Sequence, residues 1–151
     1  MRPIVLLFLV IVLQQGLAQS PIDSMRVYSR SFLASSPYGF SEPDVLREAD
    51  SELVTMASCP NNRFQILQAR CDSIRLQPNQ CGRSCVDLSM VSLVFRGAQV
   101  DTISFSSSNS MVVNGEVFDR DDELLWAIAT CLKNKTVARS IAAVLRREPN
   151  F

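Results

Sequence analysis

The sequence predicts an α+β domain: two N-terminal helices, an antiparallel meander of three to four strands and a C-terminal helical pair, held together by disulfides. Two observations support this prediction. Apolar residues recur with helical spacing on both sides of a central block, Val86–Phe118, in which they alternate with polar residues as strands do. Four of the five cysteines lie in Cys59–Cys85, and this density favours crosslinks between the helices and the sheet.

Residues 1–18 have the pattern of a secretory signal peptide. Arg2 provides a positive start, Ile4–Leu13 is a run of ten apolar residues, and Gly16–Ala18 places small residues at a cleavage site. A membrane-spanning helix needs about 20 apolar residues, twice as many. We therefore expect a secreted, extracellular chain that begins at Gln19, has no membrane contact after signal cleavage, and folds where disulfides form.

Residues 19–42 are predicted to form an extended or poorly ordered tail, because prolines and serines interrupt any apolar period there. Residues 43–151 are predicted to form a single domain. Ser41 and Asp44 fit the cap and the first turn of a helix, since a serine can accept from free backbone N–H groups and an acid favours the positive helix end. The apolar spacing extends this first helix to about Ser58.

A second helix is predicted after the turn at residues 60–62. Phe64, Leu67, Cys71 and Ile74 recur at the spacing that places them on one helical face. Cys71 therefore points inward with the apolar residues. Either it is an inert buried thiol or it forms a crosslink to another element of the core.

Strand patterns follow. Val86–Phe95 is apolar enough to be buried on both faces in its second half, and Val100–Phe105 alternates apolar with polar residues. In Met111–Phe118, the dipeptide Asn114-Gly115 lies between β-forming residues. It is typical of a type I′ hairpin, because both turn positions must accept a positive φ. These three segments predict the antiparallel meander.

The C-terminal segment predicts two helices instead of one. The apolar stripes of residues 124–132 and 137–145 would lie on nearly opposite sides of one continuous helix, so we expect a bend at Asn134-Lys135-Thr136. That tripeptide is an N-glycosylation sequon, which requires an exposed Asn134. The acidic residues Asp119–Glu123 fit a helix start. They lack the glycine and the distal acid of an EF-hand loop, which disfavours calcium.

Histidine is absent, and the formal net charge is zero. Without histidine the chain lacks the base of Ser–His and Cys–His catalysis and the commonest metal ligand. The charge balance disfavours nucleic acid as a partner. We therefore predict no enzyme, no cofactor and no metal site. The interpretation that remains is a secreted glycoprotein that binds another extracellular protein.

The cysteines that can form disulfides are Cys59, Cys71, Cys81, Cys85 and Cys131, an odd number. Cys71 and Cys131 both lie on apolar helical stripes, so we expect them to pair with each other. Cys59 would then pair with Cys81 or Cys85. The cysteine left over could join two chains as a disulfide-linked homodimer.

The stretch Cys81–Cys85 supports an alternative function. Arg83-Ser84, between the two cysteines, resembles the reactive loop of Bowman–Birk-type protease inhibitors, in which a basic residue precedes a serine near a cysteine. The loop of those inhibitors is longer, and the resemblance covers only these five positions. It implies a contact or inhibitory loop for a trypsin-like protease.

Overall fold

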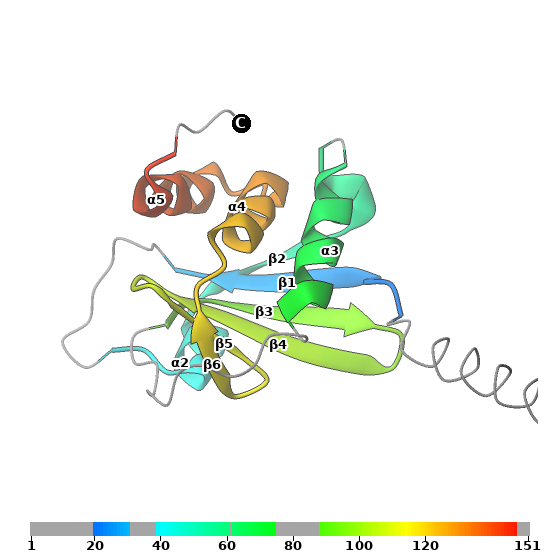
Figure 1. The fold of residues 1–151 in the computed structure, drawn as a ribbon. Coiled ribbons are helices and arrows are strands. Elements are labelled where there is room, and N and C mark those ends of the chain that lie inside the picture. Colours follow the sequence, from blue (N-terminus) through cyan, green and yellow to red (C-terminus); the bar gives the residue numbers. More distant parts are fainter. Residues whose placement is uncertain (1–19, 31–38, 61, 75–87, 148–151) are drawn as a thin grey trace, which may run out of the picture.

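The structure, a computed structural model, describes residues 20–30, 39–60, 62–74 and 88–147. Its centre is a six-stranded antiparallel sheet in the order β2-β1-β3-β4-β5-β6. Helices α3, α4 and α5 cover one face of the sheet, and the short helix α2 lies on the other (Figure 1). The predicted mixed α+β class is confirmed.

The elements follow one another along the chain as β1 (Ser24–Ser29), α2 (Glu42–Glu48), β2 (Asp50–Val54), the 3₁₀ turn η1 (Met56–Ser58), α3 (Arg63–Ile74), β3 (Leu88–Arg96), β4 (Gln99–Ser106), β5 (Ser110–Val113), β6 (Glu116–Asp119), α4 (Asp122–Cys131) and α5 (Lys135–Leu145).

Strands β3 to β6 pair in sequence order and form an antiparallel meander within the sheet. Asn114 and Gly115 connect β5 to β6 with φ values of 50° and 86°, as a type I′ turn requires. The Asn114 side chain reaches beyond its own hairpin, because its Oδ1 accepts from the backbone N–H of Thr102 at 2.8 Å. The turn residue that the sequence singles out therefore also fixes the neighbouring strand β4.

The prediction of three to four strands is wrong, because β1 and β2 complete a sheet of six. Strand β1 forms where an extended or poorly ordered tail was predicted, and it lies between β2 and β3. Met25 and Val27 are fully buried in the main core, whereas Arg26 between them is exposed. The strand therefore shows period-two alternation, which is hard to recognise in a segment of six residues.

The first predicted helix is correct only as far as Glu48. Ser41 caps α2, with its backbone N–H donating to the Asp44 carboxylate at 3.1 Å. Beyond the helix the chain turns into β2, where Val54 is fully buried and Leu53 is 48% exposed. These two neighbours alternate inward and outward as strand residues do, so pairing with β1 overrides the helical spacing.

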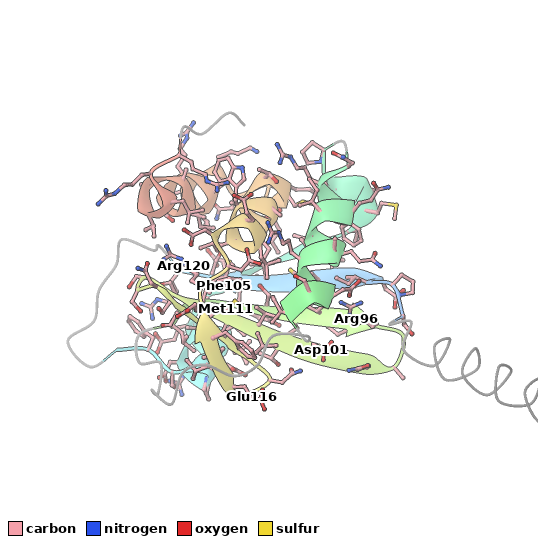
Figure 2. All side chains as sticks on the ribbon, viewed as in Figure 1. Arg96, Asp101, Phe105, Met111, Glu116 and Arg120 are labelled. Atoms are coloured by element: carbon pink, nitrogen blue, oxygen red, sulfur yellow. A yellow bond between two sulfur atoms is a disulfide. The ribbon has the colours of Figure 1, made fainter. Side chains whose placement is uncertain are left out.

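The main core lies between the sheet and helices α3, α4 and α5. The predicted inward face of α3 is confirmed by the burial of its residues Phe64, Leu67, Cys71 and Ile74. Phe105 on β4 and Met111 on β5 are fully buried opposite the helices (Figure 2). A second cluster around Val45 packs α2 against the other face of the sheet.

The predicted helical pair is also confirmed, because α4 ends at Cys131 and α5 begins at Lys135. Asn134 is exposed and caps α5. Strand β2 holds this bend: the backbone N–H groups of Lys133 and Asn134 both donate to the carboxylate of Glu52. A side chain from the sheet edge thus satisfies two backbone donors between the helices.

Replacing Glu52 with alanine is expected to lower the free energy of unfolding by about 1–2 kcal/mol, because it removes a charged acceptor from two backbone donors. Urea denaturation of the purified protein measures this loss. Asp119→Ala is the control, since it removes an exposed carboxylate from another strand, β6. Equal stability of the Glu52 and Asp119 variants would show that the Glu52 carboxylate does not hold the bend.

Candidate functional site

A disulfide between Cys59 and Cys131 joins the segment before α3 to the end of α4. The expected pairing of Cys71 with Cys131 is therefore wrong. Both residues do face the core, but a shared orientation says nothing of distance, whereas the Cα atoms of Cys59 and Cys131 are 4.4 Å apart. Cys71 is buried within α3.

Several predicted features lie outside the described residues: the signal peptide 1–18, Cys81, Cys85 and the candidate inhibitory loop Arg83-Ser84. The bond between Cys59 and Cys131 also makes the expected pairing of Cys59 with Cys81 or Cys85 wrong. A disulfide-linked homodimer through an odd cysteine stays a prediction.

A groove of about 620 Å³ lies over the disulfide. One wall is formed by residues 57–60 and Arg63, at the start of α3. The other wall is formed by residues 130–133 at the end of α4 and by Lys135 at the start of α5. The disulfide thus connects the two walls, which come from segments that are distant in the sequence.

The groove is positively charged. Arg63, Lys133 and Lys135 line it, and none of its lining residues is acidic. The ammonium group of Lys135 donates to the Leu132 carbonyl at 3.4 Å and so helps to cap α4. The side chains of Arg63 and Lys133 have no hydrogen bond or ion pair with another described residue. Two cations on opposite walls are therefore available to an anionic ligand.

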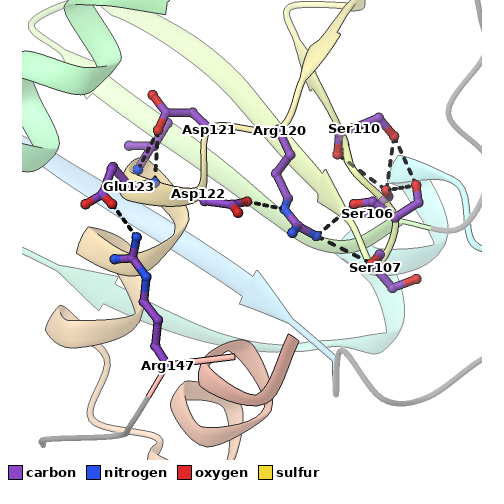
Figure 3. A network of polar contacts seen from close by, with 10 residues as sticks. Ser106, Ser107, Ser110, Arg120, Asp121, Asp122, Glu123 and Arg147 are labelled. Carbon is purple, nitrogen blue, oxygen red and sulfur yellow. Dashed lines mark hydrogen bonds and ion pairs between the residues drawn. The ribbon is translucent and has the colours of Figure 1, made fainter. Parts of the chain in front are cut away.

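The acidic run before α4 has structural partners (Figure 3). Asp121 caps α4, because its side chain accepts from the backbone N–H groups of Glu123 and Leu124 at 3.0 Å. Asp122 pairs with the Arg120 guanidinium at 2.6 Å. Helix capping and ion pairing thus account for these acids, and the described residues include no cluster of three metal-ligating side chains.

Arg120 and Arg147 extend this polar network to other elements. The Arg120 guanidinium donates to the Ser108 carbonyl at 2.9 Å, which ties the start of α4 to the β4–β5 loop (Figure 3). Arg147 donates to the Glu123 carboxylate, and its guanidinium carbon lies 5.6 Å from the centre of the Trp126 ring. Arg147, which follows α5, is therefore held against α4.

The pair Glu123–Arg147 predicts a pH-dependent contribution to stability. The hydrogen bond from Arg147, followed by its charge, lowers the pKa of Glu123 from its ordinary value of 4.5. Because the folded-state pKa is depressed, the contribution is fully present above pH 4.5 and is lost as the pH falls through the folded-state pKa. The pair is largely exposed, so solvent screening limits the effect to less than about 1 kcal/mol.

Urea denaturation at several pH values tests this expectation. Below pH 4.5 the free energy of unfolding should fall more steeply for the wild type than for Glu123→Gln. Glu116→Gln, which removes an exposed carboxylate from β6, should retain the wild-type slope. Parallel curves for the wild type and Glu123→Gln would contradict the assignment.

A second polar cluster surrounds Arg96, whose side chain is 2% exposed. Its guanidinium donates to the Ser20 carbonyl at 2.7 Å and to Asp72 of α3 at 2.6 Å, and its Nε lies 3.6 Å from Asp101 of β4 (Figure 2). Asp101 also accepts from the side-chain amide of Asn114 at 3.0 Å. The cluster joins α3, β3, β4 and the β5–β6 turn.

Asp101 and Glu116 line a hollow of about 360 Å³ beside this cluster, so two carboxylates do share a concave surface. General acid–base catalysis needs carboxylates that can exchange protons with a substrate. Asp101 instead takes part in contacts with Arg96 and Asn114 that connect the strands. These contacts give Asp101 a structural role, and the groove over the disulfide is the better candidate for ligand binding.

Sequence reasoning did not identify the groove. Lys135 was considered only as part of the sequon, and neither Lys133 nor Arg63 was singled out. The two lysines are the only ones in the chain, and this could have drawn attention to them. The position of Arg63 opposite them depends on the Cys59–Cys131 disulfide, which was not the expected pairing.

No helix in the described ranges is long and apolar enough to cross a bilayer. Comparison with protein-family models, curated proteins and solved structures finds no match for this chain.

Proposed function

We propose that this chain is a secreted, non-catalytic binding protein that uses the groove over Cys59–Cys131 to hold an acidic segment of another extracellular protein. The observation that supports this proposal is the charge of the groove, where three cations and no carboxylate line the surface. Attraction of this kind speeds encounter with an acidic partner and disfavours basic ones. A disulfide between the two walls limits their relative movement, so ligand binding costs less conformational entropy.

Three features support secretion. Residues 1–18 have the pattern of a signal peptide. A disulfide is typical of an oxidising compartment. Asn134, the acceptor of the sequon, is exposed at the bend between α4 and α5, where a glycan can be attached without entering the core.

Fluorescence anisotropy with a labelled oligoglutamate peptide tests the groove directly. The wild type should bind the peptide with an affinity that falls as salt is added. The double variant Arg63→Gln/Lys133→Gln should bind at least about tenfold more weakly, equivalent to about 1.4 kcal/mol. Equal binding by the wild type and the double variant, or no binding by either, would refute the proposal.

Arg26→Gln provides the control for net charge. Arg26 is exposed on β1, and its neighbours Met25 and Val27 point into the main core, so it lies on the opposite face of the sheet from the groove. Its removal should leave peptide affinity within about twofold of the wild type, because screening weakens charges at that distance. An equal loss in this variant would indicate nonspecific attraction.

The inhibitor alternative also stays a proposal. Incubation with trypsin distinguishes it: tight inhibition with slow cleavage after Arg83 favours an inhibitor, and rapid digestion without inhibition excludes it.

A further inference from the structure

The side chain of Asn134 is held in one orientation. Its Oδ1 accepts from the backbone N–H groups of Thr136 at 3.1 Å and Val137 at 3.3 Å. Its own backbone N–H donates to Glu52 at 3.1 Å, which fixes the main chain. Oδ1 thus caps α5, and no described residue accepts a hydrogen bond from the amide nitrogen Nδ2. Nδ2 is the atom to which an N-linked sugar is attached.

Asn134 and Thr136 line a hollow of about 370 Å³ that is separate from the groove over the disulfide. Its opposite side is formed by Ser29 and Arg30 at the end of β1 and by residues 48–50 between α2 and β2. The hollow thus lies where the start of α5 meets the sheet edge.

The polar groups of this hollow suit a sugar. A hydroxyl, a guanidinium and carboxylates can donate to and accept from the hydroxyl and acetamido groups of N-acetylglucosamine. Arg30 is already ordered: its guanidinium pairs with Glu48 at 3.1 Å and lies 3.6 Å from the centre of the Phe40 ring. Its backbone N–H also donates to the Ser89 carbonyl at 2.9 Å. Contact between a sugar and Arg30 therefore costs little further side-chain entropy.

We infer that this hollow seats the first N-acetylglucosamine of a glycan on Asn134. The sugar then packs between α5 and the β1–α2 side of the molecule instead of extending into solvent, and it stabilises the fold. Because Asn134 is not among the residues that line the disulfide groove, the glycan leaves that groove open. This inference rests on the proposed secretion but not on the proposed ligand.

The test uses the full chain secreted by cells that attach high-mannose glycans. Endoglycosidase H leaves one N-acetylglucosamine on Asn134, whereas peptide-N-glycosidase F removes the whole glycan and converts Asn134 to aspartate, which still caps a helix. The trimmed protein should melt within about 1 °C of the intact glycoprotein. The fully deglycosylated protein should melt about 2–4 °C lower.

Two variants of Thr136 distinguish the effect of losing the sugar from the effect of the aspartate that the enzyme creates. Thr136→Ala removes the sequon but keeps Asn134 and the backbone N–H that bonds to it, so it should melt with the fully deglycosylated protein. Thr136→Ser keeps the sequon and should melt with the wild type. A secreted protein without sugar on Asn134 would overturn the inference, as would equal melting of the trimmed and the fully deglycosylated forms.

Arg30 tests where the sugar lies. In Arg30→Ala the melting difference between the trimmed and the fully deglycosylated forms should fall by half or more, because the sugar loses its guanidinium partner. Arg139→Ala is the matched control: Arg139 is exposed on α5 and does not line the hollow. An undiminished difference in Arg30→Ala would place the sugar elsewhere. Oligoglutamate binding by Thr136→Ala reports on the groove independently.

Discussion

Replacing Cys59 and Cys131 together with alanine is expected to lower the free energy of unfolding by about 4 kcal/mol. The disulfide links residues 72 positions apart, and the chain-entropy model assigns a crosslink of that span about this value. The loss would be a large share of the roughly 5–15 kcal/mol that typically separates folded from unfolded states. The disulfide therefore makes one of the large contributions to the stability of the fold.

Urea denaturation under non-reducing conditions measures the loss. The single variant Cys59→Ala should cost nearly as much as the double variant, because either substitution breaks the bond between Cys59 and Cys131. If the double variant unfolded at the wild-type urea concentration, the crosslink would contribute nothing to stability. The double variant should also bind oligoglutamate more weakly, since the walls of the groove would no longer be joined.

Replacing Arg96 with methionine is expected to cost about 3–5 kcal/mol, the usual result of removing one partner from a buried ion pair. Methionine fills much of the space of the arginine stem but places no positive charge beside Asp101, whose side chain is 7% exposed. The Ser20 carbonyl also loses its partner. The free energy of unfolding falls because the buried guanidinium that links Ser20, Asp72 and Asp101 is lost.

Urea denaturation of two further variants tests this explanation. Asp72→Asn should cost less than about 1 kcal/mol, because the Asp72 side chain is 36% exposed and water can replace its contact with Arg96. Adding Asp101→Asn to Arg96→Met should recover part of the loss, because the second substitution removes a buried negative charge that no longer faces the Arg96 guanidinium. A double variant less stable than Arg96→Met alone would contradict this explanation.

The parts of the fold that depend on local sequence were predicted well. Asn114-Gly115 determines its own turn through φ, and the inward face of α3 follows from the spacing of four apolar residues. Strands β1 and β2 were missed because each is short and their pairing is not local. Met25 aligns with Val54 on one side and with Val94 on the other, and no short window of sequence contains those neighbours.

The candidate site was harder to predict for the same reason. The absence of histidine, which is visible from composition alone, disfavours Ser–His and Cys–His catalysis. The groove, however, requires Arg63 and Lys133 to lie on opposite walls, and a disulfide between distant segments joins those walls. Cysteine spacing does not determine connectivity, so the sequence could indicate the crosslinks but not the surface that they build.

The position of β1 between β2 and β3 also governs the order of events during synthesis. Its partner β3 ends at Arg96, so β1 cannot join the rest of the sheet until the ribosome has delivered most of the chain. Long-range pairing of this kind slows folding, and until it occurs the edge of β3, with Met90 and Val94, stays available to other chains. Nascent chains are therefore expected to need protection from aggregation in the compartment where they fold.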